Sequence, residues 1–331
     1  MIKLGKKGKT EAKTEKEKLD ERREEVLARG RKFKYPLQYA KHKLVFNTII
    51  IATVALIALI ILGWAMLYKF QDTGDIIYRL TRVLPVSVAN VDGEEVKFSD
   101  YLMIYRSSLR AVEQQSGQLG EGEDADFVRN EYKRSALKNA EEYAFALKIG
   151  KEEGVNVTNE EIKKAFDEQR KVGGTDRSEE SFLKVISDNF GLSKNEYERL
   201  LYLSLMRAKV EEKIDTKANA TAEKVKKMLA ENGNDFGAVR DALGAEVVYE
   251  ETGGLVDSKN VDGGRATVAL GLEPGKQSGK FVSSNGDGYY FVKLIDKNET
   301  QVNYASIKVS FSEFGQRFSE AQTKEYIEIP E

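Results

Sequence analysis

The chain has 331 residues, of which 41% are hydrophobic, and its formal net charge is −2. This length and apolar content allow about two domains with ordinary cores, which excludes a wholly disordered protein. Because the chain contains no cysteine, disulfide frameworks, thiolate nucleophiles and cysteine-ligated zinc are excluded as well.

The most distinctive segment is an uncharged run of 25 residues at Leu44–Tyr68, "LVFNTIIIATVALIALIILGWAMLY". A helix of about 20 apolar residues crosses a bilayer core, because it satisfies its own backbone hydrogen bonds. Buried core helices are rarely this long and free of charge, and the apolar part of a cleaved signal peptide is shorter. We therefore predict a retained transmembrane helix at 44–68, with Trp64 and Tyr68 at the interface.

The charge on either side of this run predicts its orientation. Residues 1–43 contain fifteen Lys and Arg against seven Asp and Glu, a net of +8, which leaves −10 for the remainder of the chain. By the positive-inside rule, residues 1–43 form a basic cytoplasmic arm, and everything after Lys69 is extracytoplasmic, beginning with a juxtamembrane linker at 69–84. The basic residues alternate with acidic ones, which favours a solvated helix near anionic lipid over nucleic-acid binding.

Residues 85–217 are predicted to form one helical domain. It opens with a short strand and a turn at Asp92-Gly93, and Ser99 is expected to cap the first long helix. Apolar residues recur at three- and four-residue steps in the segments that follow. Further helix boundaries are predicted from capping boxes and a glycine pair, at Thr158/Glu161, Ser193/Glu196 and Gly173-Gly174.

Residues 218–331 read as a mixed α and β domain. Two short helices precede a glycine-rich stretch and two strands joined by "DKNETQ". In the first of these strands, alternation places Tyr290 and Val292 on one face and Tyr289 and Phe291 on the other. Both faces are largely apolar, which predicts a covered strand. The motif "GLEPGKQS" is one residue short of a phosphate loop and is interpreted as a turn.

Catalytic groups are scarce. The only histidine is His42, beside the predicted membrane span on its cytoplasmic side. The extracytoplasmic part therefore lacks a Ser-His-Asp arrangement and histidine-ligated metal. The acidic pairs on predicted helices are interpreted as solvated surface. No metal or other cofactor is predicted.

Several segments, taken in order, resemble the SurA/PpiD/PrsA family of extracytoplasmic folding factors. "VSVANVDGEEVKFSDYLMIYRSSLR" is similar to the opening of that family's helical chaperone domain, and "EEYAFALKIGKEEGVNVTNEEIKKAF" to a later stretch. "DFGAVRDALG", "TGGLVD" and "LGLEPGKQSGKFVSSNGDGYYFVKLID" follow the order of a parvulin-type prolyl isomerase domain. The resemblance covers about residues 85–310 and implies an α+β fold with a small antiparallel sheet after the helical domain.

The sequence departs from the parvulin pattern at both family histidines. Tyr290 stands at the last-strand histidine position in "GYYFV", and Ser306 stands at the first-strand position in "YASIKV". The second motif also follows the last strand instead of preceding the helices. Since the family's first and last strands are antiparallel neighbours, a hairpin joining them would give a circularly permuted sheet. Alternatively, Tyr304–Val309 begins a further element that leads into a small C-terminal helix and a final strand.

Three functions follow from these expectations. The first is a membrane-anchored chaperone for unfolded or newly translocated polypeptides, with little or no isomerase activity. Its candidate peptide-binding residues are Tyr289, Tyr290, Phe281 and Ser306, and no catalytic residue is assigned. The second is an active prolyl isomerase, since rotation about an X-Pro bond needs no covalent chemistry. The third is a non-catalytic membrane scaffold with one defined partner.

Overall fold

The computed structural model describes residues 15–34, 36–171, 176–260, 262–283 and 286–330. The chain divides into two compact units, residues 1–70 and residues 71–331. The predicted stop at Gly173-Gly174 lies outside the described residues.

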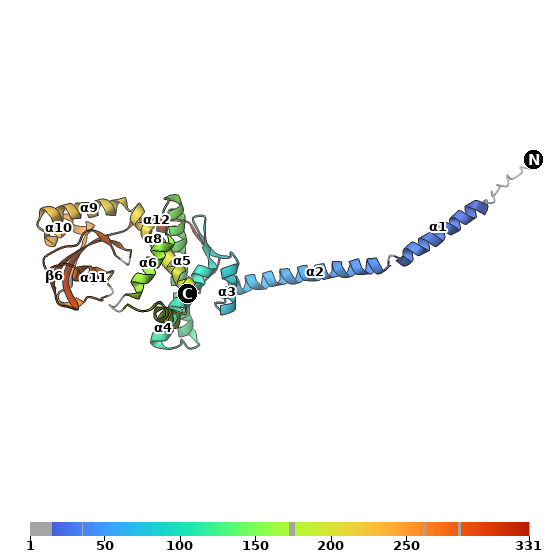
Figure 1. Ribbon diagram of the computed structural model, residues 1–331, viewed down its shortest axis with the longest axis horizontal. Coiled ribbons are helices and arrows are strands. Elements are labelled where there is room, and N and C mark those ends of the chain that lie inside the picture. The colour runs from blue at the N-terminus through green and yellow to red at the C-terminus, as the bar shows by residue number, and fades with distance from the viewer. Residues whose placement is uncertain (1–14, 35, 172–175, 261, 284–285, 331) are drawn as a thin grey trace, which may run out of the picture. The chain divides into compact units, whose positions relative to one another are not determined.

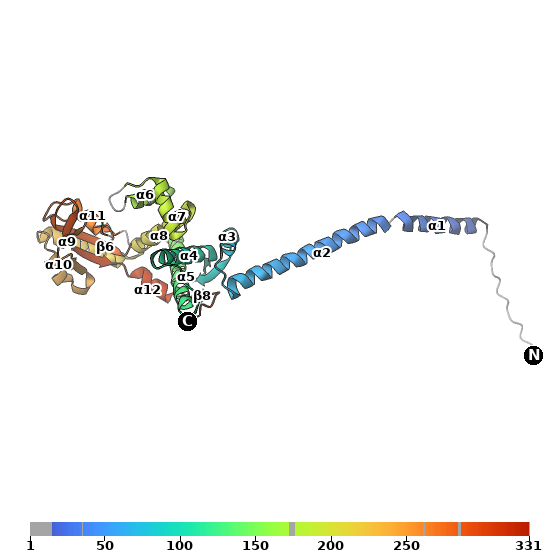
Figure 2. The same cartoon turned by 90° about the horizontal axis from the view of Figure 1, so that it is seen from below.

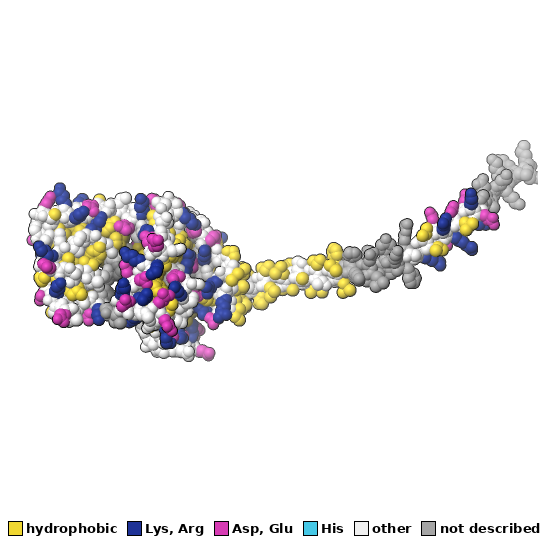
Figure 3. All heavy atoms as spheres, in the orientation of Figure 1, with side chains coloured by type: hydrophobic (Ala, Val, Ile, Leu, Met, Phe, Trp, Pro, Cys, Tyr) yellow, Lys and Arg dark blue, Asp and Glu magenta, His cyan; other side chains and the backbone are white. Residues whose placement is uncertain are grey.

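The first unit is helical, and its elements are α1 (Glu15–Lys34), α2 (Pro36–Trp64) and the π-helical turn η1 (Ala65–Lys69). Among the described residues, one helix is long and apolar enough to cross a membrane, at Lys43–Lys69. It contains the predicted span at 44–68, and apolar side chains cover its surface (Figure 3). Thr48 and Thr53 donate their hydroxyls to carbonyls four residues earlier, at 2.9 and 2.8 Å. Their polar groups are therefore satisfied within the helix, as a lipid environment requires.

The second unit has two parts. The helical part contains α3 (Asp75–Val83), β1 (Ser87–Val91), β2 (Glu94–Lys97), α4 (Phe98–Ser116), α5 (Glu123–Glu152), α6 (Asn159–Arg170), α7 (Glu179–Phe190), α8 (Lys194–Ile214), α12 (Glu313–Glu320) and β8 (Thr323–Glu325). The sheet part contains α9 (Thr216–Glu231), α10 (Phe236–Leu243), the 3-10 turn η2 (Gly244–Glu246), β3 (Val248–Glu251), β4 (Val256–Asp257), α11 (Arg265–Leu270), β5 (Phe281–Val282), β6 (Gly288–Lys297) and β7 (Gln301–Ser310).

Local capping signals determine several boundaries of the helical part. Both predicted capping boxes are confirmed, Thr158 with Glu161 at the start of α6 and Ser193 with Glu196 at the start of α8. The predicted cap at Ser99 is wrong, because α4 begins at Phe98 directly after β2. Strand and helix meet without a loop here, so the residue before the helix is Lys97, whose side chain makes no capping bond.

The core of the helical part joins residues that are distant in sequence. The rings of Phe166, Phe182 and Tyr197 pack edge to face, with centroids 5.4 to 6.0 Å apart, and connect α6, α7 and α8. Arg199 on α8 binds Asp100 on α4 through a 2.7 Å ion pair. These contacts connect α8 with α4, α6 and α7.

The C-terminal segment returns to the helical part. β1 pairs with β2 across the turn at Asp92-Gly93, and β8 adds to the other edge of β1 in an antiparallel pairing. Figure 2 shows β8 and α12 close to α5. The small helix and final strand considered from sequence are therefore α12 and β8. The division predicted between 217 and 218 stays a prediction, but the residues after 312 pack with the helical part.

The sheet part is an antiparallel sheet of strand order β3-β7-β6-β5, with β4 also paired to β7. Figure 1 shows α9 and α10 over one face, with α11 lying against the other. Tyr289 and Phe291 face α9 and α10, whereas Val292 and Leu294 face α11, so the predicted alternation is confirmed. β6 and β7 pair along their length, as the hairpin requires.

A buried carboxyl group under the three-stranded sheet makes stability depend on pH. Glu141 of α5 is 6% exposed, and its Oε1 atom has no hydrogen-bond partner within the described residues. Burial, followed by the nearby Glu325 and Glu142, raises the pKa of this carboxyl from 4.5 to about 7. The folded state therefore holds a proton that the unfolded state releases between these two values.

We expect the free energy of unfolding to fall as the pH rises from about 4.5 to about 7, and then to level off. Glu141→Gln removes this dependence and should stabilise the protein at pH 8 by about 1–2 kcal/mol. Urea unfolding across this pH range measures the effect. Glu131→Gln, at a half-exposed site on the same helix, is the control and should keep the slope. Equal slopes in all three proteins would contradict a buried titrating Glu141.

Candidate functional site

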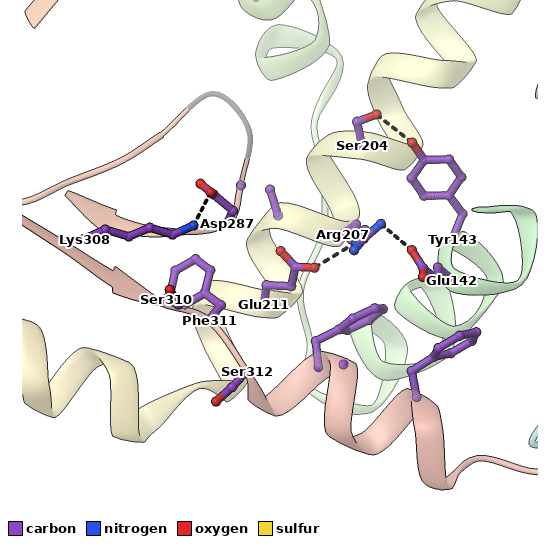
Figure 4. Close-up of a pocket in the computed structure, with 15 residues that line it drawn as sticks. Glu142, Tyr143, Ser204, Arg207, Glu211, Asp287, Lys308, Ser310, Phe311 and Ser312 are labelled. Atoms are coloured by element: carbon purple, nitrogen blue, oxygen red, sulfur yellow. Dashed lines mark hydrogen bonds and ion pairs between the residues drawn. The ribbon is translucent and has the colours of Figure 1, made fainter. Parts of the chain in front are cut away.

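A cavity of about 510 Å³ lies where the two parts of the second unit meet. Its walls are α5 and α8 on one side, α12 below, and the residues that border β6 and β7 on the other side (Figure 4). The cavity is therefore built from segments that are far apart in sequence, including residues after the predicted parvulin-like strands.

Asp215 binds both segments of the chain that connect the helical part to the sheet part beside this cavity. It lies between α8 and α9 and is 2% exposed. Its carboxylate accepts hydrogen bonds from the backbone N–H of Ala218 at 2.8 Å, Ser312 at 2.7 Å and Glu313 at 3.1 Å. One side chain thus caps the start of α9 and also binds the segment that enters α12. This fixes where the chain leaves the helical part and where it returns.

Phenylalanine rings make the apolar wall. Phe314 and Phe318 of α12 pack on Phe145 of α5, with ring centroids 5.5 and 5.6 Å apart. Phe311 packs edge to face on Tyr289 at 4.9 Å. Phe311 and Phe318 are only half-buried, so they offer apolar surface to a ligand in the cavity.

The polar wall centres on Arg207 of α8. Its guanidinium binds Glu142 at 2.5 Å and Glu211 at 2.8 Å, and it lies 5.3 Å from the centroid of the Phe314 ring. Burial raises the pKa of Glu211 despite the hydrogen bond from Arg207, and the neighbouring carboxylates of Glu142 and Asp287 raise it further. The charges are thus paired with one another but lie beside an aromatic surface.

The sheet part contributes a second ion pair to the cavity. Lys308 of β7 binds Asp287, which also accepts hydrogen bonds from Ser283 at 2.6 Å and from the hydroxyl of Tyr290 at 3.1 Å. Burial alone would raise the pKa of Asp287, but the bonds from Lys308 and Ser283 outweigh it, and the pKa lies below its ordinary value. Asp287 is therefore the ionised partner of Lys308 at neutral pH.

Tyr290 and Ser306, the two residues that the sequence interpretation assigned to histidine positions, lie on one face of the sheet. They are 4% and 1% exposed. Arg265 of α11 connects them, because its Nη1 atom is 3.4 Å from the Ser306 hydroxyl and its guanidinium lies 5.3 Å from the centroid of the Tyr290 ring. Arg265 also binds Glu250 of β3. Tyr290 and Ser306 therefore lie close to the same side chain, but both are buried, and that side chain is already paired with Glu250.

The other two candidate residues lie apart from each other. Phe281 is half-buried and packs against Tyr290 at 6.1 Å. Tyr289 faces the opposite side, with Lys280 4.6 Å from its ring centroid, and lines a more polar cavity of about 570 Å³. The roles of all four residues in peptide binding stay predictions.

Sequence reasoning missed Arg207 and the three phenylalanines of the cavity. The signal for the phenylalanines was present in "FSEFGQRF", which spaces Phe311, Phe314 and Phe318 at helical intervals of three and four residues. For Arg207, no local pattern distinguishes it from the many charged residues of α8. Among the described residues, no group of three or more acidic or histidine side chains could hold a metal ion.

β8 pairs with β1 and so belongs to the helical part, and a cavity with aromatic and charged walls lies between this part and the sheet. The fold is therefore that of a two-part protein with a site suited to binding. The chain belongs to the family of the SurA-like N-terminal domain, whose sequence model matches residues 37–211, more than half of the chain. The match includes both α5 and most of α8. A comparison with curated proteins gives no match.

Family membership indicates a chaperone-type folding factor of the periplasmic class. The candidate transmembrane helix at Lys43–Lys69, together with the SurA-like domain, fits a membrane-anchored extracytoplasmic protein.

Proposed function

We propose that the protein is a membrane-anchored extracytoplasmic chaperone that binds unfolded or newly translocated polypeptides in the cavity between its two parts. The main support for this proposal is the lining of the cavity, which combines half-exposed aromatic rings with the ion pairs of Arg207. Unfolded chains present apolar side chains together with unpaired peptide groups. Aromatic rings offer contact area to the apolar side chains, and an Arg guanidinium can donate hydrogen bonds to peptide carbonyl groups.

The N-terminal unit supports the proposed anchoring and orientation. The +8 charge of residues 1–43 precedes the apolar helix, and no such excess of Lys and Arg follows it. This asymmetry favours a cytoplasmic N-terminus, with the helical and sheet parts of the second unit outside. Anionic lipid is the proposed partner of the basic arm, and no nucleic-acid partner is proposed.

The sheet part is proposed to be a degenerate, circularly permuted parvulin-like domain. The central antiparallel pair β6 and β7 supports this proposal, since these strands carry the "GYYFV" and "YASIKV" motifs and are joined directly to each other. A prolyl isomerase must admit its substrate to the face between the two family positions. Tyr290 and Ser306 are buried there and contact Asp287 and Arg265, which favours little or no isomerase activity.

We expect the full chain in lipid nanodiscs to suppress aggregation of an enzyme diluted from denaturant. Ser204→Trp should weaken this effect roughly ten-fold, because the new ring fills the cavity without removing an apolar contact. Ser204 is exposed on α8 and lines the cavity. Light scattering of the client at increasing chaperone concentration measures the apparent affinity. Ser181→Trp, at an exposed position on α7 that does not line the cavity, is the matched control.

The same preparations should leave the rate of cis–trans isomerisation of an X-Pro peptide within about two-fold of the uncatalysed rate. A strong acceleration that is lost in Tyr290→Ala would replace the proposal with an active isomerase. Failure of the wild-type chain to hold several unrelated clients would instead indicate a scaffold for one partner. Equal holding by Ser204→Trp and Ser181→Trp would place the binding site elsewhere.

A further inference from the structure

The first helix of the second unit exposes an apolar stripe. Ile76 and Val83 of α3 are 82% and 81% exposed, the highest values among the large apolar side chains that the structure describes and higher than those of the candidate span itself. Leu80 and Leu84 extend the stripe, at 39% and 45%. The spacing from 76 to 80 and 83 places these three side chains on one side of the helix, and Leu84 follows directly after its last residue. Isolated exposed apolar residues are ordinary, but a continuous stripe at this exposure indicates a surface that is covered in use.

The opposite side of α3 is firmly attached to the helical part. Ile77, Tyr78 and Thr81 are buried. The Tyr78 hydroxyl donates to Glu196 of α8 at 2.6 Å, and Arg106 of α4 lies 5.0 Å from the Tyr78 ring centroid. The stripe is therefore carried by a fixed helix and does not belong to a loose linker.

Chain connectivity restricts what can cover this stripe. The candidate membrane helix ends at Lys69, and α3 begins at Asp75. The five residues between them span at most about 20 Å even when fully extended. If Lys43–Lys69 crosses a bilayer, α3 must therefore lie within reach of the headgroup layer on the same side.

Charge on α3 is also complementary to a phospholipid surface. Arg79 is exposed and follows Ile76 by three residues, and Arg82 is partly exposed beside Val83. Arg side chains next to an apolar stripe bind lipid phosphates while the stripe enters the boundary with the acyl chains. Arg82 forms an ion pair with Glu196 of α8 at 3.2 Å. The test therefore removes the charge of Arg79, which leaves this ion pair intact.

We propose that α3 is an interfacial helix that inserts Ile76 and Val83 into the outer surface of the phospholipid bilayer and thereby holds the helical part against the membrane. This inference rests on the membrane anchoring proposed above. Its consequence is that the chaperone is held at the bilayer surface at two points, the transmembrane helix and α3, and does not rotate freely on a flexible tether.

The absence of cysteine from the chain allows single labels to be placed cleanly. We would attach a fluorophore to Val83→Cys, to Lys184→Cys as a control on α7 whose side chain is 75% exposed, and to Ala58→Cys within the candidate span. The full chain is reconstituted in phosphatidylcholine vesicles with brominated acyl chains, with and without phosphatidylglycerol. Quenching by bromine then reports contact with lipid.

The expected result is that the Val83 label is quenched about three-fold more strongly than the Lys184 label, and that phosphatidylglycerol increases the difference. Arg79→Gln should remove that increase. Thermal unfolding of each labelled protein checks that the substitutions leave the fold intact.

Three outcomes would overturn the proposal. If the Ala58 label is quenched but the Val83 label behaves like that at Lys184, the anchor holds and α3 is not interfacial. If neither the Ala58 nor the Val83 label is quenched, the membrane anchoring itself fails. If the Val83 label is shielded from an aqueous quencher without bromine quenching, and dilution of the protein in lipid abolishes the shielding, a second copy of the chain covers the stripe.

Discussion

Gly288→Ala is expected to lower the free energy of unfolding of the sheet part by about 3 kcal/mol or more. Gly288 begins β6 opposite Ser310 of β7. A Cβ atom at this position would lie 2.4 Å from the carbonyl oxygen of Val309 and 3.1 Å from the Cα of Ser310. Both neighbours are backbone atoms in the central strand pair, so relief requires the strands to separate. Urea unfolding monitored by tyrosine fluorescence measures the loss.

Gly279→Ala is the matched control for this substitution. Gly279 is exposed in the loop before β5, and a Cβ atom there meets nothing within 4 Å. Its replacement should change stability by less than about 1 kcal/mol, because the main effect is on the entropy of the unfolded chain. Equal stability of the two variants would mean that β6 and β7 do not approach each other as closely as the register requires.

Asp215→Ala is expected to cost about 3 kcal/mol and to weaken client binding even where the protein remains folded. The substitution leaves the three backbone N–H groups of Ala218, Ser312 and Glu313 without their buried acceptor. It also frees the segment that enters α12 from the end of α8, so the walls of the cavity lose their fixed spacing. Hydrogen exchange at Ser312 and Glu313, together with the aggregation assay, reports the two effects separately.

Asp235→Ala provides the comparison for an ordinary helix cap. Asp235 is exposed and caps α10 through one bond to the Ala238 N–H, at 3.0 Å. Its loss should cost about 1 kcal/mol and leave client binding unchanged. If Asp215→Ala lowered the free energy of unfolding and client binding no more than Asp235→Ala, the Asp215 carboxylate would not be needed to hold the two connecting segments together.

The parts of the fold that sequence predicted are those encoded by neighbouring residues. The capping boxes at Thr158 and Ser193 and the alternation of Tyr289 with Tyr290 all depend on residues within a few positions of one another. The uncharged run at 44–68 is likewise a local property. The error at Ser99 also has a local cause, since a Ser before an apolar helix resembles a cap, but β2 continues directly into α4.

The cavity could not be predicted in the same way, because its contacts join distant residues. Arg207 binds Glu142 across 65 positions, Asp215 binds Ser312 across 97, and β8 pairs with a strand more than 200 positions earlier. None of these partners carries a spacing or motif that identifies the other. The resemblance in sequence singled out Tyr290 and Ser306, which lie on the face of the sheet that α11 covers, whereas the open space lies at the end of the sheet, beside α12.

The hydrogen bond between Asp215 and Ser312 also shows that the sheet part is inserted into the helical part, and that the two ends of the inserted segment lie next to each other. The chain leaves the helical part after α8 and re-enters it at α12, and one carboxylate touches both points. A segment with neighbouring ends can be lost, gained or exchanged in a single genetic event while the host domain keeps both of its own termini. The helical part can therefore retain its fold when the inserted sheet part is altered or replaced.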